Sequence, residues 1–320
     1  MMNMTRSTQD LFMTVLFGFL VLTGMGWPVM PVDAEDASLG PKREKDDGES
    51  ILLDSVRYSS ANADEPPMFI EPDPMFSWRE FAGQDQNPIF EMGEILVYDV
   101  SWMGIHAGTI TMTLEPKVVF EDKPVFRIVI VGETNKTFSV FFKVHDVVTS
   151  YIDPETFNSI HYIKDVREGD YRKLKETRYD QVAQKAWVRG ESYDLPPNSK
   201  DPVACIFSLR RYAPAPGKSL RMNSNSEGKS NYPVEVGFVA DESLELNGDI
   251  ARSVVRGEPR PTRGSDLLAK KQSKVVFWMT DDEFAVPLRL ETKLRIGTLK
   301  ADLVRRTGPG WTMNRKKDAE

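Results

Sequence analysis

With 320 residues, of which 40% are hydrophobic and 28% charged, the chain has the composition of a soluble globular protein. The formal net charge of -7 gives no general attraction to nucleic acid, and no basic stripe with interleaved aromatic residues is present. The single cysteine, Cys205, excludes a disulfide framework. Nucleic-acid binding and a disulfide-stabilised fold are therefore not expected.

The first 34 residues have the pattern of an export signal. The apolar run LFMTVLFGFLVLTGMGWPVM follows a short polar start, and Val32 and Ala34 are the small residues expected before a cleavage point. The run also approaches the length that spans a bilayer, so an uncleaved anchor is the alternative. In both cases we expect the body of the protein in the periplasm, touching the membrane only through an uncleaved leader.

Residues 35–87 are rich in Asp, Glu, Ser and Pro. Such a composition cannot bury enough apolar area to offset the entropy of the chain, so a disordered linker is expected. The stretch PMFIEPDPMFSWREF (67–81) is the exception, and it would either lie against the domain or dock a partner.

From about residue 88 to residue 306 the pattern becomes strand-like. In EILVYDVSW, Leu96, Tyr98, Val100 and Trp102 share one face, and similar alternating runs follow at even spacing up to GTLKADLVRR. Short segments of turn chemistry such as EDKP and DPETFN separate them. This spacing is typical of an all-β sandwich or barrel, with residues 307–320 left as a flexible tail.

One segment, DPVACIFSLRRYAP, interrupts the strands. It begins with Asp-Pro, ends at a proline and has apolar residues at helical spacing. We expect a short helix with Asp201 at its N-cap and Pro202 at its first position.

The stretch GEILVYDVSWMGIHAG (93–108) predicts a hairpin. Gly104 suits a tight turn, and Gly108 would allow the backbone of a neighbouring strand to approach closely. His106 lies at the shoulder of this hairpin without an obvious orienting partner in the local sequence, so we do not assign it a catalytic role.

Four ordered motifs resemble the family known as domain of unknown function 3108. They are FEMGEILVYDVSWMGIHAGTITMTLE (90–115), HDVVTSYIDPETF (145–157), DPVACIFSLRRY (201–212) and VVFWMTDDEFAVPLRLETKLRIGTL (275–299). The resemblance covers about 88–306. It implies export in Gram-negative bacteria and a curled antiparallel sheet or half-open β-barrel with one short helix. It attaches no reaction to the chain.

No motif for catalysis or metal binding is present. The three histidines form no HExxH pair, and there is no GxSxG elbow and no phosphate-binding loop. Cys205 lies in an apolar segment where a packing role is expected, and Asp281–Asp282 has the pattern of a solvated turn. We therefore predict no catalytic residue, no metal and no cofactor.

The aromatic residues of this region are numerous for one β-domain. They would either fill the core or line a concave surface for a lipid, glycan or peptide ligand. For the second case the candidate ligand-binding residues are Tyr98, Trp102, Trp278, Arg210, Arg289 and Glu291.

Three functions remain open from the sequence. The preferred one is a non-enzymatic periplasmic domain that binds an apolar or amphipathic envelope ligand, or an envelope protein partner. The alternatives are an envelope glycan or peptide hydrolase that uses carboxylates at the mouth of a barrel, and a structural interaction protein with a filled core. An aromatic-lined cavity would favour the first, and a carboxylate pair of raised pKa in a cleft the second. A packed interior would favour the third.

Overall fold

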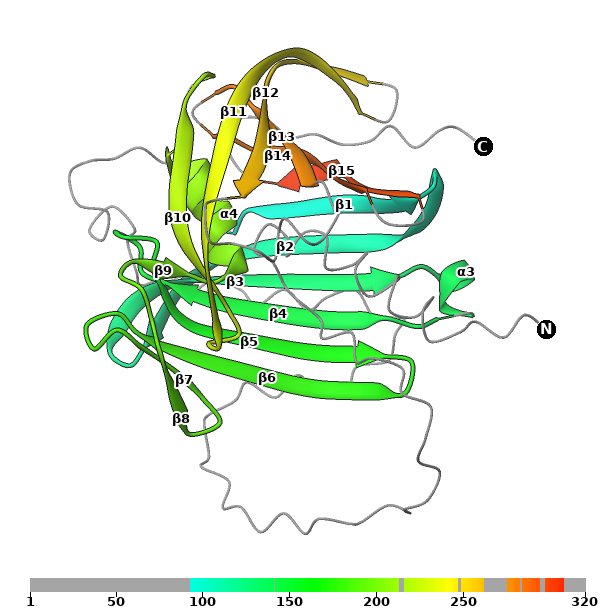
Figure 1. The fold of residues 1–320 in the computed structure, drawn as a ribbon. Coiled ribbons are helices and arrows are strands. Elements are labelled where there is room, and N and C mark those ends of the chain that lie inside the picture. The colour runs from blue at the N-terminus through cyan, green and yellow to red at the C-terminus, as the bar shows by residue number, and fades with distance from the viewer. Residues whose placement is uncertain are drawn as a thin grey trace, which may run out of the picture. The chain divides into compact units, whose positions relative to one another are not determined.

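The computed structural model describes residues 93–140, 142–212, 216–246, 249–261, 275–282, 284–293 and 297–307. The expected leader and linker, and the tail beyond residue 307, lie outside these ranges. The described residues form one 15-stranded curled sheet and two helices, which confirms the expected all-β class (Figure 1). The second helix, α3 (Lys136–Ser139), was not expected; its N-cap Asn135 accepts a hydrogen bond from the Phe138 backbone N–H at 2.8 Å.

The first half of the sheet is an antiparallel meander in which each strand pairs with the next one in the chain. Its strands are β1 (Ile95–Trp102), β2 (Ile105–Phe120), β3 (Lys123–Thr134), β4 (His145–Ile152), β5 (Ser159–Glu168), β6 (Tyr171–Asp180), β7 (Lys185–Val188) and β8 (Glu191–Asp194).

The second half is a meander too, and it joins the first through the β1–β15 pair. It consists of β9 (Ser199–Lys200), β10 (Ser219–Ser226), β11 (Ser230–Leu246), β12 (Asp249–Pro261), β13 (Val275–Thr280), β14 (Pro287–Lys293) and β15 (Thr298–Thr307), with helix α4 (Pro202–Tyr212) between β9 and β10. The short β9 pairs with β10 in parallel, and the other pairs are antiparallel.

The connectivity explains why the sheet must curl. Strands β8 and β9 lie at opposite edges of the sheet, yet only residues 195–198 separate them in the chain. A chain extends by about 3.6 Å per residue, so the two edges cannot be more than about 18 Å apart. A flat sheet of this width is therefore impossible, and the sheet curls into an open spiral that brings the end of β8 close to the start of β9.

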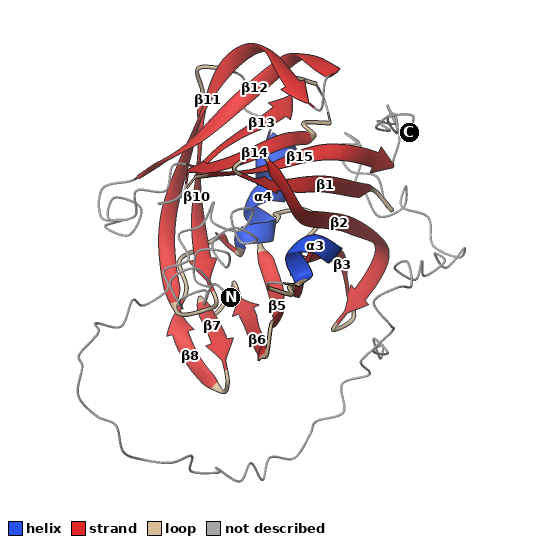
Figure 2. Ribbon diagram, turned by 90° about the vertical axis from the view of Figure 1, so that its right-hand side faces the viewer, coloured by secondary structure: helices blue, strands red, loops and turns tan. Residues whose placement is uncertain are grey.

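Helix α4 fills the inside of this spiral (Figure 2). Every residue from Pro202 to Arg210 is buried, and its apolar side chains join those of the inner sheet face in one core. The expected N-cap is confirmed, since Asp201 Oδ1 accepts hydrogen bonds from the backbone N–H groups of Val203 at 2.8 Å and Ala204 at 3.0 Å. Neither described helix is long and apolar enough to cross a membrane.

One strand differs from the expected pattern. The segments NYPVEVGFV and ESLELN read as two strands, but β11 runs through both without a break. Ala240 and Asp241 between them continue the ladder by pairing with Val255 and Val254 of β12. The partner strand, rather than apolar alternation, maintains the extended conformation there.

Candidate functional site

A buried ion triad joins the two halves of the chain. Glu94, just before β1, receives hydrogen bonds from Arg210 of α4 at 2.7 and 3.1 Å and from Nε of Arg306 on β15 at 2.9 Å. Arg210 and Arg306 are fully buried, and Glu94 is 2% exposed. Burial alone would raise the pKa of Glu94, but the charges and hydrogen bonds of the two guanidinium groups outweigh it and hold that pKa below its usual value.

Tyr98 lies beside this triad and belongs to the core. Its side chain is fully buried, and its hydroxyl donates a hydrogen bond to the Pro287 carbonyl at 3.0 Å. Burial raises the pKa of this phenol far above its normal range. Tyr98 and Arg210 therefore lie close together, but both are enclosed, and their contacts hold the end of α4 against β1 and β14.

A second ionisable cluster lies on the inner face of β4 and β5. Asp146, Lys164 and Glu168 are each at most 5% exposed, although all three carry ionisable groups. The Asp146 carboxylate accepts hydrogen bonds from the backbone N–H of Arg167, at 2.7 Å, and from the Glu168 carboxyl group. Burial, the neighbouring Asp146 charge and this hydrogen bond raise the pKa of Glu168 to about 8, so the pair shares a proton at neutral pH.

Lys164 connects this carboxyl pair with the opposite side of the spiral. Burial lowers the pKa of Lys164 to about 7, against the opposing charge of Glu227 at 3.9 Å. Glu227 lies in the β10–β11 turn, and both of its carboxylate oxygens accept hydrogen bonds from Lys175 of β6 at 2.7 Å. The turn packs tightly, because a Cβ on Gly228 would come within 2.3 Å of the Val188 side chain. The β10–β11 hairpin thus closes the spiral across β5–β7.

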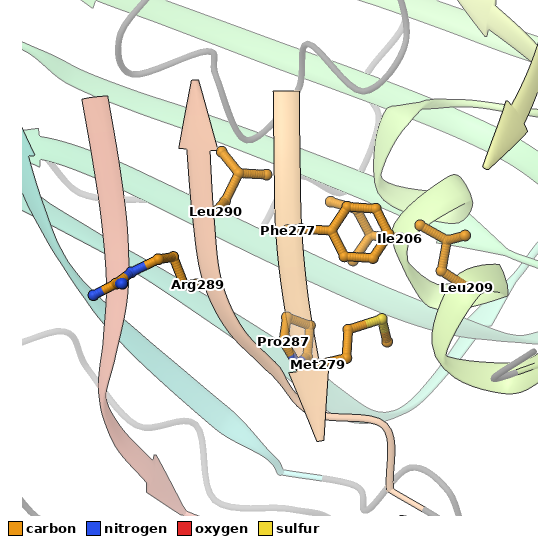
Figure 3. A pocket seen from close by; sticks show the side chains of 7 residues that line it. All are labelled: Ile206, Leu209, Phe277, Met279, Pro287, Arg289 and Leu290. Carbon is orange, nitrogen blue, oxygen red and sulfur yellow. The ribbon is translucent and has the colours of Figure 1, made fainter. Parts of the chain in front are cut away.

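A small apolar hollow lies between α4 and the β13–β14 corner (Figure 3). Its volume is about 20 Å³, close to the space that a single water molecule needs. Pockets for small molecules usually measure about 300–1,000 Å³. Arg289 borders the hollow, but in Figure 3 its guanidinium group points away from the six apolar side chains that form the lining, which are Ile206, Leu209, Phe277, Met279, Pro287 and Leu290.

Three of the six candidate ligand-binding residues lie on the outer face of the sheet. Trp278 is directly opposite Arg289 in the β13–β14 ladder, and it alternates with Phe277 and Met279, whose side chains are inside. Arg289 forms an ion pair with Asp302 of β15. Glu291 is 3.7 Å from Lys300 on the same outer face.

The remaining candidate, Trp102, lies at the end of β1 and packs partly against the core. The six candidates therefore occupy three places: the interior, the outer face of β13–β15 and the end of β1. That they bind a ligand remains a prediction, but the structure does not bring them together into one site.

The other residues with reactive side chains have structural surroundings. Burial raises the pKa of the Cys205 thiol to about 12, so the nucleophilic thiolate is disfavoured. His106 is half exposed and lies 3.7 Å from Asp99, while Asn135 Nδ2 donates a hydrogen bond to the His106 carbonyl at 2.7 Å. Within the described part of the chain, no group of three or more His, Cys, Asp or Glu side chains is placed to hold a metal ion.

The comparison with known families agrees with the motifs in the sequence. The model of a family of proteins of unknown function, DUF3108, matches residues 97–304, more than half of the chain. The chain belongs to the DUF3108 family. No curated protein matches the sequence.

Three solved structures are similar to this DUF3108 protein in outline only. One is a β-barrel-like protein of the DUF1849 domain from Brucella abortus, with 12% identity over 67% of this chain and 96% of that chain and a TM-score of 0.46. The second belongs to the DUF1089 family of Pseudomonas aeruginosa, with 10% identity, 68% and 95% coverage and a TM-score of 0.28. A candidate exported protein with a YmcC-like fold from Bacteroides fragilis has 12% identity, 68% and 97% coverage and a TM-score of 0.26. Similarities as low as these support no inference about function.

The sequence pattern had not marked Asp146, Lys164 and Glu168 of this DUF3108 protein. Each of the three lies in a β-strand, where the sequence around a buried polar residue resembles the sequence around one that faces solvent. A signal was nevertheless present, since Asp146 is two residues from Val148, and Lys164 and Glu168 are two residues from Val166. Alternation therefore places all three on the face that buries these valines.

The shared proton of the carboxyl pair predicts a pH dependence of stability. The pKa of Glu168 is raised from 4.5 to about 8 on folding, so its contribution is complete below about 4.5 and is lost as the pH rises to about 8. In the DUF3108 protein, Glu168→Gln should mimic the protonated form. We expect this variant to exceed wild type in free energy of unfolding by at least ~1 kcal/mol at pH 8 and to match it at about pH 4. Urea unfolding at both pH values measures this.

The matched control is Glu155→Gln in the exposed β4–β5 connection. It should leave the difference between about pH 4 and pH 8 unchanged. A Glu168→Gln variant that is less stable than wild type at pH 8 would show that Glu168 is ionised there and would contradict the shared proton.

Proposed function

We propose that this DUF3108 protein is an exported, non-enzymatic domain of the cell envelope that binds an envelope partner through its surface. The observation that carries the proposal is the packed interior. Helix α4 is buried along nine consecutive residues inside the spiral, and the hollow beside it has a volume of only about 20 Å³. An acyl chain or a sugar ring needs far more room than this.

The buried ion triad supports the same proposal. Opening the hollow for a ligand would require α4 to move, and Arg210 of α4 holds Glu94 through two hydrogen bonds in the interior. Separating one partner from a buried pair costs about 3–5 kcal/mol, because an uncompensated charge is left behind. The structure of the core therefore favours α4 as a fixed part of the domain and not as a lid.

Export rests on the N-terminal sequence. The apolar run of residues 11–30 followed by Val32 and Ala34 is the pattern of a secretion signal. One buried cysteine and no disulfide suit a domain whose stability does not depend on the redox state of its compartment.

The hydrolase alternative has one observation in its favour, the raised pKa of Glu168 beside Asp146. A general acid must also come within hydrogen-bond reach of its substrate. Asp146 is 4% and Glu168 is 5% exposed, so a glycan or peptide could not contact either carboxyl group in this structure. We therefore favour a role for this pair in closing the spiral.

Native mass spectrometry tests the proposal. The full chain is expressed, and the soluble protein is purified, incubated with a lipid and glycan extract of the envelope, and weighed. We expect the mass of the polypeptide alone. The variant Leu209→Ala, which enlarges the hollow, reports whether the assay detects an apolar ligand once space exists.

A lipid or glycan that co-purifies with wild type and is recovered by solvent extraction would overturn the proposal. The domain would then be a binding protein that encloses an apolar or amphipathic ligand. Failure to recover any of the protein in the periplasmic fraction would contradict export separately.

A further inference from the structure

The meander brings three connections to one end of the sheet. Successive connections of an antiparallel meander alternate between its two ends, so those of β1–β2, β3–β4 and β5–β6 lie together. Asn135 Nδ2 donates to the His106 carbonyl at 2.7 Å, and the Gly169 N–H donates to the Lys143 carbonyl at 2.7 Å, so each connection touches the next. In Figure 1 the β1–β2 hairpin and α3 lie at the right-hand end of the sheet.

Large apolar side chains are exposed at all three connections. Met103 and Ile105 of the β1–β2 hairpin are 59% and 61% exposed, Val140 after α3 is 81% exposed, and Tyr171 at the start of β6 is 43% exposed. Trp102 and Phe138 beside them are partly exposed. We call this surface the apolar end. Single exposed apolar residues are ordinary, but a group of them on neighbouring tips marks an interaction surface.

The charges of the connections differ between the two ends. At the apolar end the connections contain Lys136 and Lys143 against one carboxylate, Asp170. Within the described residues neither lysine forms an ion pair. Two further carboxylates near this end face histidines, since Asp99 is 3.7 Å from His106 and Glu133 is 3.6 Å from His145.

At the opposite end the connections β2–β3 and β4–β5 are acidic, and the connection β6–β7, residues 181–184, has no charged residue and exposes Val182. The two acidic connections contain Glu121, Asp122, Asp153 and Glu155 and no lysine or arginine, although β3 begins with Lys123. A protein with a net charge of -7 is repelled from an anionic surface as a whole. This distribution therefore leaves one orientation favourable, with the apolar end toward the anionic surface and the acidic end away from it.

We propose that the apolar end docks onto an anionic phospholipid bilayer, with Met103, Ile105 and Val140 entering the headgroup region and Lys136 and Lys143 contacting lipid phosphates. The proposal rests on the proposed function and names the partner surface. Aromatic residues and lysines beside exposed aliphatic side chains suit the interface of a bilayer. A lysine or an amphipathic aromatic side chain can bury its apolar part among the lipid chains and keep its polar part among the headgroups. The sequence alone had placed membrane contact only at the leader.

Vesicle flotation with purified soluble protein tests this. Vesicles of phosphatidylethanolamine and phosphatidylglycerol should carry the protein, and vesicles of phosphatidylcholine should carry at least tenfold less. The double variant Ile105→Asp/Val140→Asp should reduce flotation at least tenfold. Each of the variants Lys136→Ala and Lys143→Ala should weaken vesicle binding about fivefold. Salt at about 0.5 M screens surface charges and should weaken the binding of wild type by a similar factor.

The matched controls are Leu174→Asp and Val119→Asp. Leu174 on the outer face of β6 is 61% exposed, and Val119 near the opposite end is 59% exposed, so both resemble Ile105 in exposure but lie elsewhere. Both controls should float like wild type, and all variants should keep the wild-type melting temperature because the altered side chains are exposed.

Two results would overturn the proposal: no flotation with anionic vesicles, or flotation that the apolar-end variants leave unchanged. Capture of a protein at the apolar end without vesicle binding would also contradict the bilayer as the partner. Each of these leaves the packed interior and the proposed surface function intact. A ligand found inside the spiral by mass spectrometry would instead overturn the proposed function, whatever the vesicles show.

Discussion

Replacing Glu94 by glutamine should lower the free energy of unfolding by about 3–5 kcal/mol, because the guanidinium groups of Arg210 and Arg306 would remain buried without a counter-charge. This is a large share of the ~5–15 kcal/mol that stabilises a typical domain. Urea unfolding followed by tryptophan fluorescence measures the loss.

Glu291→Gln is the matched control for this prediction. Glu291 pairs with Lys300 on the partly exposed outer face, where an ion pair contributes about 0–1 kcal/mol. Replacing Glu94, Arg210 and Arg306 together by leucine and two methionines should recover much of the lost stability, since the uncompensated charge accounts for most of the cost. Equal losses for Glu94→Gln and Glu291→Gln would contradict a dry interior.

Gly108→Ala should prevent folding. A Cβ at this position would lie 2.1 Å from the backbone carbonyl oxygen of Glu133 on β3, and the backbone of a central strand cannot move aside. We expect no soluble protein, or a melting temperature at least ~10 °C below wild type, as a loss of several kcal/mol implies. A variant that melts like wild type would show that β2 and β3 are further apart than the structure places them.

Gly257→Ala provides the comparison. Its Cβ would lie 2.0 Å from the ring of Phe277, which is a side chain and can be shortened. Gly257→Ala should be destabilising alone and partly rescued by Phe277→Leu, whereas shortening side chains around Gly108 should rescue nothing there. Comparing the Gly108 and Gly257 variants therefore distinguishes a clash with the backbone from a clash with a side chain.

Much of the strand pattern was predictable because it depends on local alternation. The inward face of β1 and the Asp201–Pro202 start of α4 both follow from neighbouring residues, and both are confirmed. The close backbone approach expected at Gly108 is confirmed in the same way. The union of two expected strands into β11 was not predictable, since it depends on pairing with β12, which lies farther along the chain.

The arrangement of side chains across strands was largely hidden. Arg289 and Glu291 were candidates for a concave ligand surface, but they alternate along β14 with the buried Leu288 and Leu290, and one sequence does not show which side of this strand faces α4. The same limit applies to Arg210, whose partner Glu94 is 116 residues away in the chain. Strand order brings these groups together, and no local pattern encodes that order.

The filled spiral and the apolar end are consistent with a domain that binds its partner through a fixed surface. The buried triad and the closing hairpin hold a rigid body, and one end of it exposes Met103, Ile105, Val140 and Tyr171. A rigid body that presents a fixed surface can bind without the entropy loss of ordering that surface.

Hydrogen exchange of the α4 amides tests the central claim, a fixed helix in a packed interior, most directly. The experiment compares the protein alone with the protein in the presence of envelope lipid extract. If α4 is a structural plug, the amides beyond its first turn exchange among the slowest in the chain, near the rate of global unfolding, and lipid leaves them unchanged. Fast exchange in α4, or a change in α4 together with β13–β14 when lipid is added, would show that the interior opens for a ligand.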